Sequence, residues 1–498
     1  MDAVDAYHFN EQDLDAWAEA LIDQGRFDEI AQALQGLEAA QIGERPSLLR
    51  LQAHAAYQQG DFEQAFPLIQ EAQQLAVHQD AWRPAVYCAL DEARWWQTRE
   101  QYEAAHLALE AARRLAERMP VGNIELQADL LLAVSRLMPD FSQNREAVVL
   151  CDRALHLYER IGHLAGQVQS LWLLSVINTY MAHLTEARAQ IERALLLHQM
   201  AGLAPVLRLY LLNVSAHVHL YAGQAQAGLQ VVRRDAAGLL QEFPHSKPAL
   251  YLVMAEGALL RQQRRFTETL AVYDRAEKIV DALEDEGYRP WLAFHRGWTH
   301  VLMGESPARV RATLMQAGVL QNEVMVRALN MYLAALDVLE ERFVDAEALL
   351  EKISVDFDQS AHFLELFAVR VYQARVYEQQ GRVGRLREAM ERSLGWAEEA
   401  GVDYFPHYWH PQVVAGVCMA ALRLGVHSRQ AELMIIRRLG DVAAPGLVGL
   451  LADESLTVRQ RARSVLAALG DDAFQSILDG APGPRLNAIL LAHVRQGR

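Results

Sequence analysis

Residues 47–78 read SLLRLQAHAAYQQGDFEQAFPLIQEAQQLAVH, a pattern of two helices joined by a tight turn. Leu48 and Leu51 belong to an apolar stripe at helical spacing. Gly60 is placed to end this helix, because glycine tolerates the left-handed C-cap conformation, and Asp61 can cap the helix that follows. A second apolar stripe comes next. One such hairpin cannot bury its stripes alone, so this stretch predicts a unit that packs against copies of itself.

Small residues mark the same point of the first helix in ten copies of this unit, most of them about 40 residues apart. The ten are Ala18, Ala53, Ala93, Ser135, Ser175, Ser215, Gly257, Gly297, Ala334 and Ala374. Small side chains at a fixed offset let two helices approach closely in every copy. The chain is therefore predicted to be an all-α solenoid, a class of fold that usually binds its ligands rather than transforming them.

The first predicted hairpin, residues 1–46, departs from the consensus, as the terminal unit of a repeat array often does. Glycine and proline residues mark the loops between the later copies, because both residues favour turns. The later hairpins are predicted at residues 47–78, 82–119, 124–162, 164–202, 204–242, 247–285, 288–322, 323–357 and 360–400. We expect the repeat region to span residues 1–403.

The pattern resembles the tetratricopeptide repeat. That repeat has a small residue in its first helix, an aromatic residue at the start of its second helix and alanines within the second helix. Phe62, Ala65 and Ala72 match the last two features in the quoted copy. The spacing is longer than in that repeat and is similar to that in the sensor regions of MalT-type bacterial transcription activators. The resemblance implies a right-handed superhelical solenoid of about ten tetratricopeptide-like hairpins over residues 1–400, with a regulatory binding role.

Residues 404–439 resemble the segment that closes the repeat array in those activators. The matching residues are Tyr404, Phe405, Trp409, Pro411, Val414, Cys418, Ala421, Gly425, Arg437 and Arg438. Residues 440–470 resemble one HEAT-type repeat, with Pro445 at the start of a helix and Ser455 at its turn. We therefore expect a closing helical segment at 404–439 and a HEAT-like C-terminal cap at 440–498, whose last hairpin is residues 471–496.

The formal net charge of −16 argues against general nucleic-acid binding by the body of the chain, because an acidic surface repels phosphate backbones. No run of about 20 apolar residues lacks charges, so no membrane span is expected. The N-terminus shows no signal-peptide pattern. Cys88, Cys151 and Cys418 lie far apart inside helical patterns, and we expect them to be reduced core thiols of a cytoplasmic protein.

Motifs of nucleotide-binding loops, zinc proteases, thiol redox sites, serine hydrolases and EF-hands do not occur in the sequence. We therefore predict that the protein is not an enzyme and has no cofactor and no metal site. His407 and His410 could present two imidazoles to one ion, but no third ligand is evident, and we favour a packed aromatic junction. Trp95 and Trp96 could stack on nucleic-acid bases, but packing between helices is the simpler interpretation.

The inner wall of a tetratricopeptide superhelix comes from one face of each first helix, at positions spaced by four and three residues. The predicted partner-binding groove consists of Arg50, His54, Tyr57, Arg94, Gln97, Arg136, Trp172, Thr179, His219, Met254, Arg261, Phe294, Trp298 and Arg375. Arginines on successive hairpins suit a carboxylate or an acidic peptide, because guanidinium groups pair bidentately with planar anions. Apolar anchors beside a cation suit a peptide or helix laid in the groove. Each of these residues could instead cover helix surface or pack against a second helix.

We predict a non-enzymatic regulatory or scaffold protein that binds a protein or peptide in this groove, with a small effector as a further ligand. The alternative is a transcription regulator that contacts DNA through its C-terminal arginines. These arginines are Arg437, Arg438, Arg459, Arg461 and Arg463. A third hypothesis, a hydrolase or transferase acting in the groove, lacks a catalytic constellation.

Overall fold

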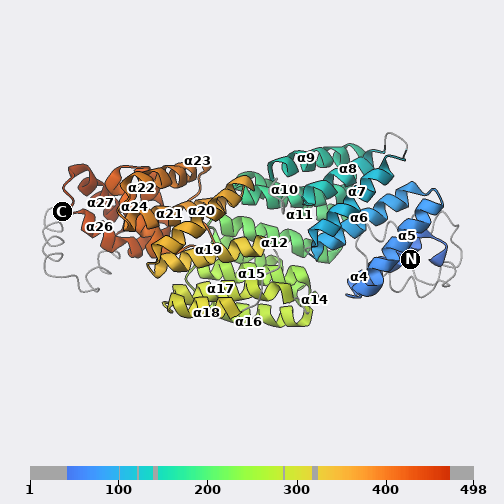
Figure 1. The fold of residues 1–498 in the computed structure, drawn as a ribbon, viewed down its shortest axis with the longest axis horizontal. Helices are drawn as coiled ribbons and strands as arrows, with labels where there is room; N and C mark the ends of the chain where they lie inside the picture. Colours follow the sequence, from blue (N-terminus) through green and yellow to red (C-terminus); the bar gives the residue numbers. More distant parts are fainter. Residues whose placement is uncertain are drawn as a thin grey trace. The chain divides into compact units, whose positions relative to one another are not determined.

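The structure is a computed structural model, and it describes residues 42–99, 101–119, 123–137, 144–283, 286–316 and 323–470 (Figure 1). Within these ranges every regular element is a helix, and no residue lies in a strand. The all-α prediction is confirmed. The predicted hairpin at 1–46, apart from its last residues, and the predicted hairpin at 471–496 lie outside the described residues.

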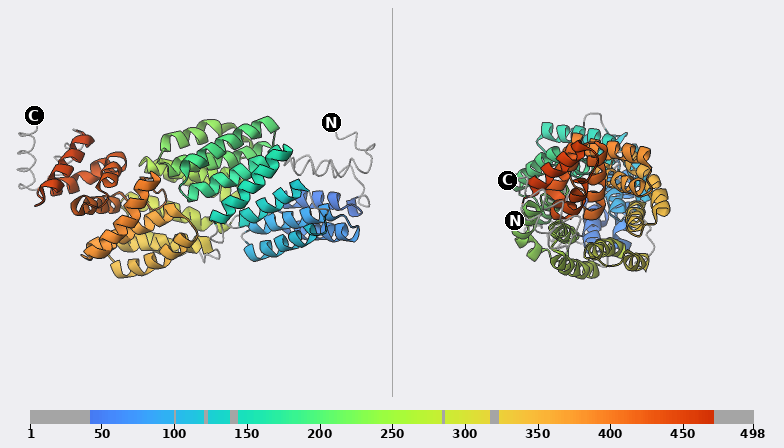
Figure 2. Two further views of the ribbon diagram at one scale, coloured as in Figure 1. Left: turned by 90° about the horizontal axis from the view of Figure 1, so that it is seen from above. Right: turned by 90° about the vertical axis from the view of Figure 1, so that its left-hand side faces the viewer.

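The helices follow one another as hairpins, which Figure 2 shows from two further directions. The first helices are α4 (Pro46–Gln58), α6 (Trp82–Thr98), α8 (Ile124–Leu137), α10 (Leu164–Tyr180), α12 (Pro205–Tyr221), α15 (Lys247–Gln262), α17 (Arg289–Leu302), α19 (Glu323–Leu339) and α21 (Phe363–Gln379). The second helices are α5 (Phe62–His78), α7 (Tyr102–Ala116), α9 (Asn144–Ile161), α11 (Leu184–Ala201), α16 (Phe266–Leu283), α18 (Pro307–Gln316) and α20 (Phe343–Gln359).

Two hairpins have a second helix interrupted by a π-helical turn. One consists of α13 (Ala225–Gln230), η3 (Val231–Asp235) and α14 (Ala237–Glu242), and the other of α22 (Val383–Met390), η5 (Glu391–Gly395) and α23 (Trp396–Ala400). The hairpins predicted between residues 47 and 400 are thus confirmed, and the described chain is a stack of tetratricopeptide-like hairpins.

The described residues form two compact units. Of these described residues, the first unit contains those within 42–178, 185–215 and 238–243, and the second contains those within 179–184, 216–237 and 244–470. The predicted domain boundary at residue 403 falls inside the second unit, where Tyr404, Phe405 and Trp409 belong to the same buried core as α19 and α21.

The quoted hairpin folds as its residues predict. Gly60 has a φ of +80° at the turn between α4 and α5, a conformation that favours glycine. The Asp61 carboxylate accepts a hydrogen bond from the backbone N–H of Gln64 at 3.1 Å and so caps α5. The turn between these two helices is therefore set by local chemistry.

Two of the ten repeat-marking positions are glycine because a second helix presses directly on the first. A Cβ atom at Gly257 in α15 would overlap the ring of Tyr273 in α16. At Gly297 in α17, a Cβ would lie 2.9 Å from a methyl group of Val310 in α18. A small residue at this position is thus required for the two helices of each of these hairpins to pack so closely.

The chain continues after the repeats with α24 (Pro411–Leu424), α25 (Ser428–Met434), η6 (Ile435–Leu439) and η7 (Gly440–Ala443). The last described helices are α26 (Ala444–Leu450) and α27 (Leu456–Leu469). Ser455 caps α27, at the turn the sequence predicts. The resemblance of this pair to a HEAT repeat stays a prediction. Cys88, Cys151 and Cys418 are all buried and unpaired.

Candidate functional site

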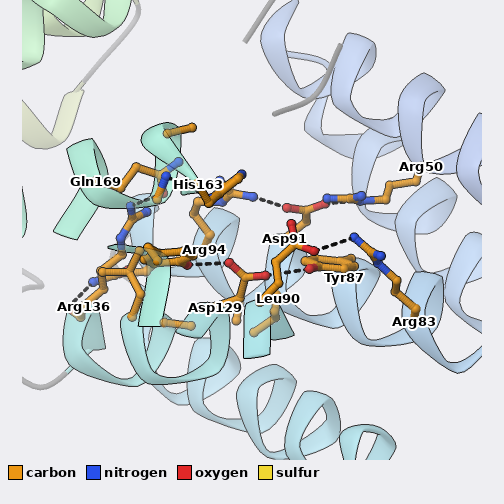
Figure 3. Close-up of a pocket in the computed structure, with 18 residues that line it drawn as sticks. Arg50, Arg83, Tyr87, Leu90, Asp91, Arg94, Asp129, Arg136, His163 and Gln169 are labelled. Carbon is orange, nitrogen blue, oxygen red and sulfur yellow. Dashed lines mark hydrogen bonds and ion pairs between the residues drawn. The ribbon is translucent and has the colours of Figure 1, made fainter. Parts of the chain in front are cut away.

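A cavity of about 130 Å³ lies in the first unit and is lined by residues of α4, α6, α8, α9 and α10 (Figure 3). We call it the first-unit cavity. The predicted groove residues Arg50, Arg94, Gln97 and Arg136 all line it. Positions predicted to share one face of successive first helices therefore come together around one space.

Asp91 is the counter-ion of the first two predicted arginines. Its Oδ2 lies 2.6 Å from Nε of Arg50 and 2.8 Å from Nε2 of His54, and Arg94 pairs with its other oxygen. Burial opposes ionisation of Asp91, but Arg50, His54 and Arg94 outweigh it and hold the pKa of Asp91 well below its usual range. Burial also lowers the pKa of His54, although the carboxylate of Asp91 acts in the opposite direction.

Asp129 forms a second polar centre in the cavity. Its two oxygens accept hydrogen bonds from the hydroxyl groups of Tyr87, at 2.6 Å, and Tyr158, at 2.5 Å. Burial raises the pKa of Asp129 above its ordinary value, although both tyrosine hydrogen bonds act in the opposite direction. Both acceptor oxygens of this carboxyl group are thus already engaged.

Arg136 differs from the other cavity arginines, because it has no carboxylate partner among the described residues. Its Nη2 donates to the amide oxygen of Gln169 at 2.8 Å, and its guanidinium lies 5.7 Å from the ring centroid of Trp172. Its Nε is buried and hydrogen-bonds to no described residue. Burial, together with the positive charge of Arg94, lowers the pKa of Arg136 to about 10.

The charges that line the first-unit cavity do not balance. Arg50, Arg83, Arg94 and Arg136 face Asp91, Glu125 and Asp129, which leaves one positive charge when all three carboxyl groups are ionised. Arg83 pairs with Glu125 at 2.9 Å, and Arg50 with Asp91. Arg50 and Arg94 share Asp91 as their partner, and Arg136 forms no ion pair with a carboxylate among the described residues. An anion is therefore the group that this space is suited to accept.

The remaining predicted residues of the first unit are packed or half-buried. Tyr57 stacks on Trp95, with ring centroids 4.4 Å apart, and Trp96 stacks on Phe66 at 3.9 Å. Packing between helices therefore accounts for the Trp95 and Trp96 pair. Gln97 donates to the backbone carbonyl of Arg136 at 2.6 Å.

In the second unit, the first-helix faces carry a piece of the chain itself that forms no helix, residues 402–410, which bends at residues 406–408. We call this non-helical stretch the extended segment. Its backbone carbonyls accept hydrogen bonds from side chains: the carbonyl of Pro406 from Arg261 at 3.3 Å, and that of Trp409 from Trp298 at 3.3 Å. The carbonyl of Tyr408 likewise accepts from the hydroxyl of Tyr372 at 2.8 Å.

The predicted anchors of the second unit are consequently covered. Phe294 and Trp298 are each 1% exposed and belong to the core that includes Tyr408 and Trp409. Met254 and Arg261 are also buried. These four side chains are not open to a partner in this structure, and Arg261 and Trp298 hydrogen-bond to the extended segment itself. The sequence predicted the helix face on which these four residues lie, but it did not predict that residues 402–410 pack on that face.

Other predicted groove residues are scattered in the second unit. Thr179 is buried, and His219 contacts the amide oxygen of Gln224 at 3.0 Å through Nδ1. Arg375 pairs with Glu378 at 2.5 Å, one turn along the same helix. Like Arg50 and His54, they are engaged by residues of the chain itself.

Several of the C-terminal arginines that were predicted to contact DNA form hydrogen bonds or ion pairs within the chain. Arg438 pairs with Asp403 at 2.6 Å and donates to the carbonyl of Gly223 at 2.7 Å. Arg459 donates to the carbonyls of Asp453 and Glu454. Arg437 is 3.4 Å from Asp403, Arg461 is half-buried and Arg463 is exposed. Among the described residues, no contact or burial of these arginines favours a DNA-binding surface.

His407 and His410 lie in the aromatic core. His407 Nε2 is 3.0 Å from the hydroxyl of Tyr221, and the His410 ring lies 6.2 Å from that of Trp298. Burial lowers the pKa of His407 to about 3 and that of His410 to about 4. Within the described ranges, no three His, Cys, Asp or Glu side chains gather closely enough to hold a metal ion. No described helix is long and apolar enough to cross a bilayer.

Sequence reasoning missed the residues that decide the charge of the first-unit cavity. Asp91 lies among the apolar positions of α6, between Leu90 and Ala93, and a carboxylate on such a face is a signal of a buried ion pair. Asp129 offers the same signal in α8. Nothing in the local sequence indicates that Tyr87 and Tyr158 converge on Asp129.

No family model matches the chain, and no curated protein matches it. Among solved structures, the chain is similar to the Rap protein complexed with competence and sporulation factor, at 12% identity and a TM-score of 0.42. That match covers 77% of this chain and 99% of the other. It is also similar to the APC/C hetero-tetramer Cut9-Hcn1, at 13% identity and a TM-score of 0.35, with 95% of each chain covered. A monomeric IFIT1 mutant with m7Gppp-AAAA has 11% identity and a TM-score of 0.32, over 92% of this chain and 95% of that one. Scores at this level do not assign the chain to a family.

Proposed function

We propose that this chain is a non-enzymatic binding protein whose first unit takes a carboxylate of a protein or peptide partner into the first-unit cavity. The observation that carries the proposal is Arg136, a guanidinium group without a carboxylate partner among the described residues. Burial and the charge of Arg94 both lower the pKa of Arg136. A carboxylate placed beside both arginines opposes this destabilisation and forms charge-assisted hydrogen bonds.

The size of the cavity limits what can enter it. A volume of about 130 Å³ admits a group the size of a few water molecules. An acidic side chain or a C-terminal carboxylate fits this space, and the rest of a peptide does not. The partner therefore lies outside, along the faces of α6, α8 and α10, and inserts one acidic group.

The second unit supports this mode of binding. There, the equivalent faces of the first helices hold the extended segment through its backbone carbonyls. Side-chain donors on three hairpins thus suit a non-helical peptide, whose backbone carbonyls are free to accept hydrogen bonds. In the first unit, the comparable face carries the surplus positive charge instead.

We place this partner binding in signalling or transcriptional control in the cytoplasm. The resemblance of the repeat spacing to the sensor regions of MalT-type activators supports that role. Direct DNA contact is the alternative, and a gel shift that weakens steeply with salt and is abolished in Arg461→Gln/Arg463→Gln would establish it.

The test uses a fluorescein-labelled hexaglutamate peptide and the full chain, with fluorescence anisotropy at low ionic strength. Hexaglutamine serves as the uncharged comparison. We expect saturable binding of hexaglutamate that weakens about tenfold or more in Arg136→Gln, which is the loss expected for one charged hydrogen-bond partner. Arg113→Gln is the matched control, because Arg113 is an exposed arginine of α7 that pairs with Glu110 outside the cavity.

Equal binding by wild type and Arg136→Gln would refute the cavity as the site. If Arg113→Gln weakened binding as much as Arg136→Gln, the interaction would be a general attraction to arginine. Once a partner is captured from the native cytoplasm, the same pair of variants decides whether it enters the first-unit cavity.

A further inference from the structure

A second and larger cavity, of about 730 Å³, lies in the second unit. We call it the second-unit cavity. Its wall is formed by the end of α15, the start of α13, the extended segment and η6. Sites for small molecules commonly have volumes of about 300–1,000 Å³, so a whole small ligand fits here. The site is independent of the first-unit cavity, because the two share no residue.

The charge of this cavity is opposite to that of the chain. Arg261, Arg264, Arg437 and Arg438 line it, and no described Asp or Glu does. Two carboxylates outside the lining pair with three of these arginines: Asp403 with Arg437 and Arg438, and Asp441 with Arg264. Four positive charges against two negative charges leave a surplus of two, in a protein whose net charge is −16.

Arg261 is the centre of this surplus. It is 4% exposed and has no carboxylate partner among the described residues. Its donors reach the backbone carbonyls of His295 and Pro406, both at 3.3 Å. The positive charge of a buried guanidinium group is not compensated when the group contacts only neutral acceptors. Binding of an anion close to Arg261 is therefore favourable.

Polar atoms without hydrogen bonds also surround the cavity. Both amide atoms of Gln262 and Nδ1 of His410 are buried and hydrogen-bond to no described residue. In native structures such atoms are usually satisfied, so a ligand or ordered water belongs beside them. The ring of Phe266 and those of Tyr404 and Trp409 form apolar parts of the wall.

The position of Arg438 is fixed by the backbone. Gly223 has a φ of +68°, and a Cβ at this residue would overlap the guanidinium of Arg438. A side chain at residue 223 would therefore displace the Arg438 guanidinium from its contacts with the carbonyl of Gly223 and the carboxylate of Asp403. Arg438 is thus held in the wall of the cavity by defined contacts, unlike a free surface side chain.

We infer that the second-unit cavity binds a small organic phosphate monoester with an apolar or aromatic body. A phosphate monoester carries nearly two negative charges at pH 7 and has three acceptor oxygens, which matches a surplus of two charges spread over several guanidinium groups. The body of the ligand lies against the aromatic wall, and its polar groups meet Gln262 and His410.

The test uses phenyl phosphate as the probe and isothermal titration calorimetry on the full chain. We expect saturable binding that is tighter than that of inorganic phosphate, because the ring adds apolar contact, and that weakens with added salt. The affinity should fall about tenfold in Arg437→Gln and in Arg264→Gln. Both arginines are largely exposed, so these variants keep the fold.

Arg423→Gln is the matched control. Arg423 is as exposed as Arg264, forms an equally long ion pair with Asp453 at 3.7 Å, and does not line the cavity. Absence of saturable phenyl phosphate binding would overturn the inference, as would an equal loss of affinity in Arg423→Gln. Tighter binding of succinate than of phenyl phosphate would overturn the assignment to a phosphate. Loss of binding in Arg136→Gln would move the site to the first unit.

Discussion

Arg50 and Asp91, on the first helices of two successive hairpins, form a buried ion pair with Nε 2.6 Å from Oδ2. The two side chains are 6% and 1% exposed. A charge at this depth is tolerated only while its partner is present. The pair therefore fixes α4 against α6, and it explains why Arg50 is not available to a ligand.

Asp91→Asn should lower the free energy of unfolding by about 3–5 kcal/mol, since it leaves Arg50 buried beside a neutral group. Denaturant unfolding of the full chain measures this loss. Glu110→Gln is the control: Glu110 and Arg113 are also 2.6 Å apart, but both are about half exposed. An exposed pair contributes about 0–1 kcal/mol, so equal losses would contradict our account.

Gly257→Ala should destabilise the second unit by about 1–3 kcal/mol, because the new methyl group overlaps the ring of Tyr273. Gly384→Ala, in the first turn of α22, meets no atom within 4 Å and should instead stabilise slightly. Thermal unfolding of both variants tests the contrast. A shift of the same sign in both would show that close packing is not the reason for glycine at 257.

Glu365 should make stability depend on pH near neutrality. Burial raises the pKa of Glu365 from its ordinary 4.5 to about 7, and its Oε1 accepts a 3.3 Å hydrogen bond from Tyr221. A raised pKa in the folded state means that the stabilisation is complete below pH 4.5 and is lost as the pH rises through 7. The loss amounts to about 3 kcal/mol at most, from 1.36 kcal/mol per pKa unit.

Glu365→Gln removes this titration. We expect the variant to be more stable than wild type at pH 8 and to differ little from it at pH 4.5. Unfolding curves at both values measure the difference. The lowered pKa of His407, about 3, makes stability fall below about pH 6.5 in both proteins alike, so its contribution cancels from the difference between them. A constant difference between the two proteins across this range would contradict the assignment.

Tyr372→Phe should cost about 1–3 kcal/mol, because it leaves the buried carbonyl of Tyr408 without its donor at 2.8 Å. It should also speed protease cleavage within residues 402–410. Tyr273→Phe provides the comparison: that hydroxyl group is buried and hydrogen-bonds to no described residue, so its removal should be neutral or stabilising. Equal effects of the two changes would mean that the hydroxyl of Tyr372 does not hold the extended segment.

The three cysteines should be unreactive in the folded protein. Burial raises the pKa of Cys88, Cys151 and Cys418 to about 12, which suppresses the nucleophilic thiolate. A chromogenic disulfide reagent at pH 8 should label none of them until denaturant is added, and then all three. Rapid labelling of one thiol under native conditions would show that its surroundings open.

The hairpins could be predicted from the sequence because they depend on local features. The small residue at 257, the glycine at 60 and the cap at Asp61 each act within one hairpin. The candidate sites depend on distant residues instead. Arg94 and Arg136 were predicted to lie on one face of successive first helices, and they do line one cavity. The spacing of residues in the sequence, however, does not indicate which other part of the chain covers a helix face.

Trp298 illustrates this limit. Its place on the predicted face made it a candidate anchor for a partner, yet its indole donates to a carbonyl 111 residues away in the chain itself. Trp298→Ala would therefore test folding rather than partner binding. The same holds for Arg261, whose acceptor on Pro406 is 145 residues distant.

The extended segment has a consequence for how the second unit unfolds. In a repeat array each hairpin contacts only its neighbours, so unfolding can start at one end and proceed stepwise. Residues 406–409 instead receive hydrogen bonds from α15, α17 and α21, so a single segment ties three separate hairpins together. Opening any one of these hairpins removes a bond that holds the shared segment and so weakens the contacts of the others. We therefore expect the unit to melt in one cooperative transition rather than hairpin by hairpin.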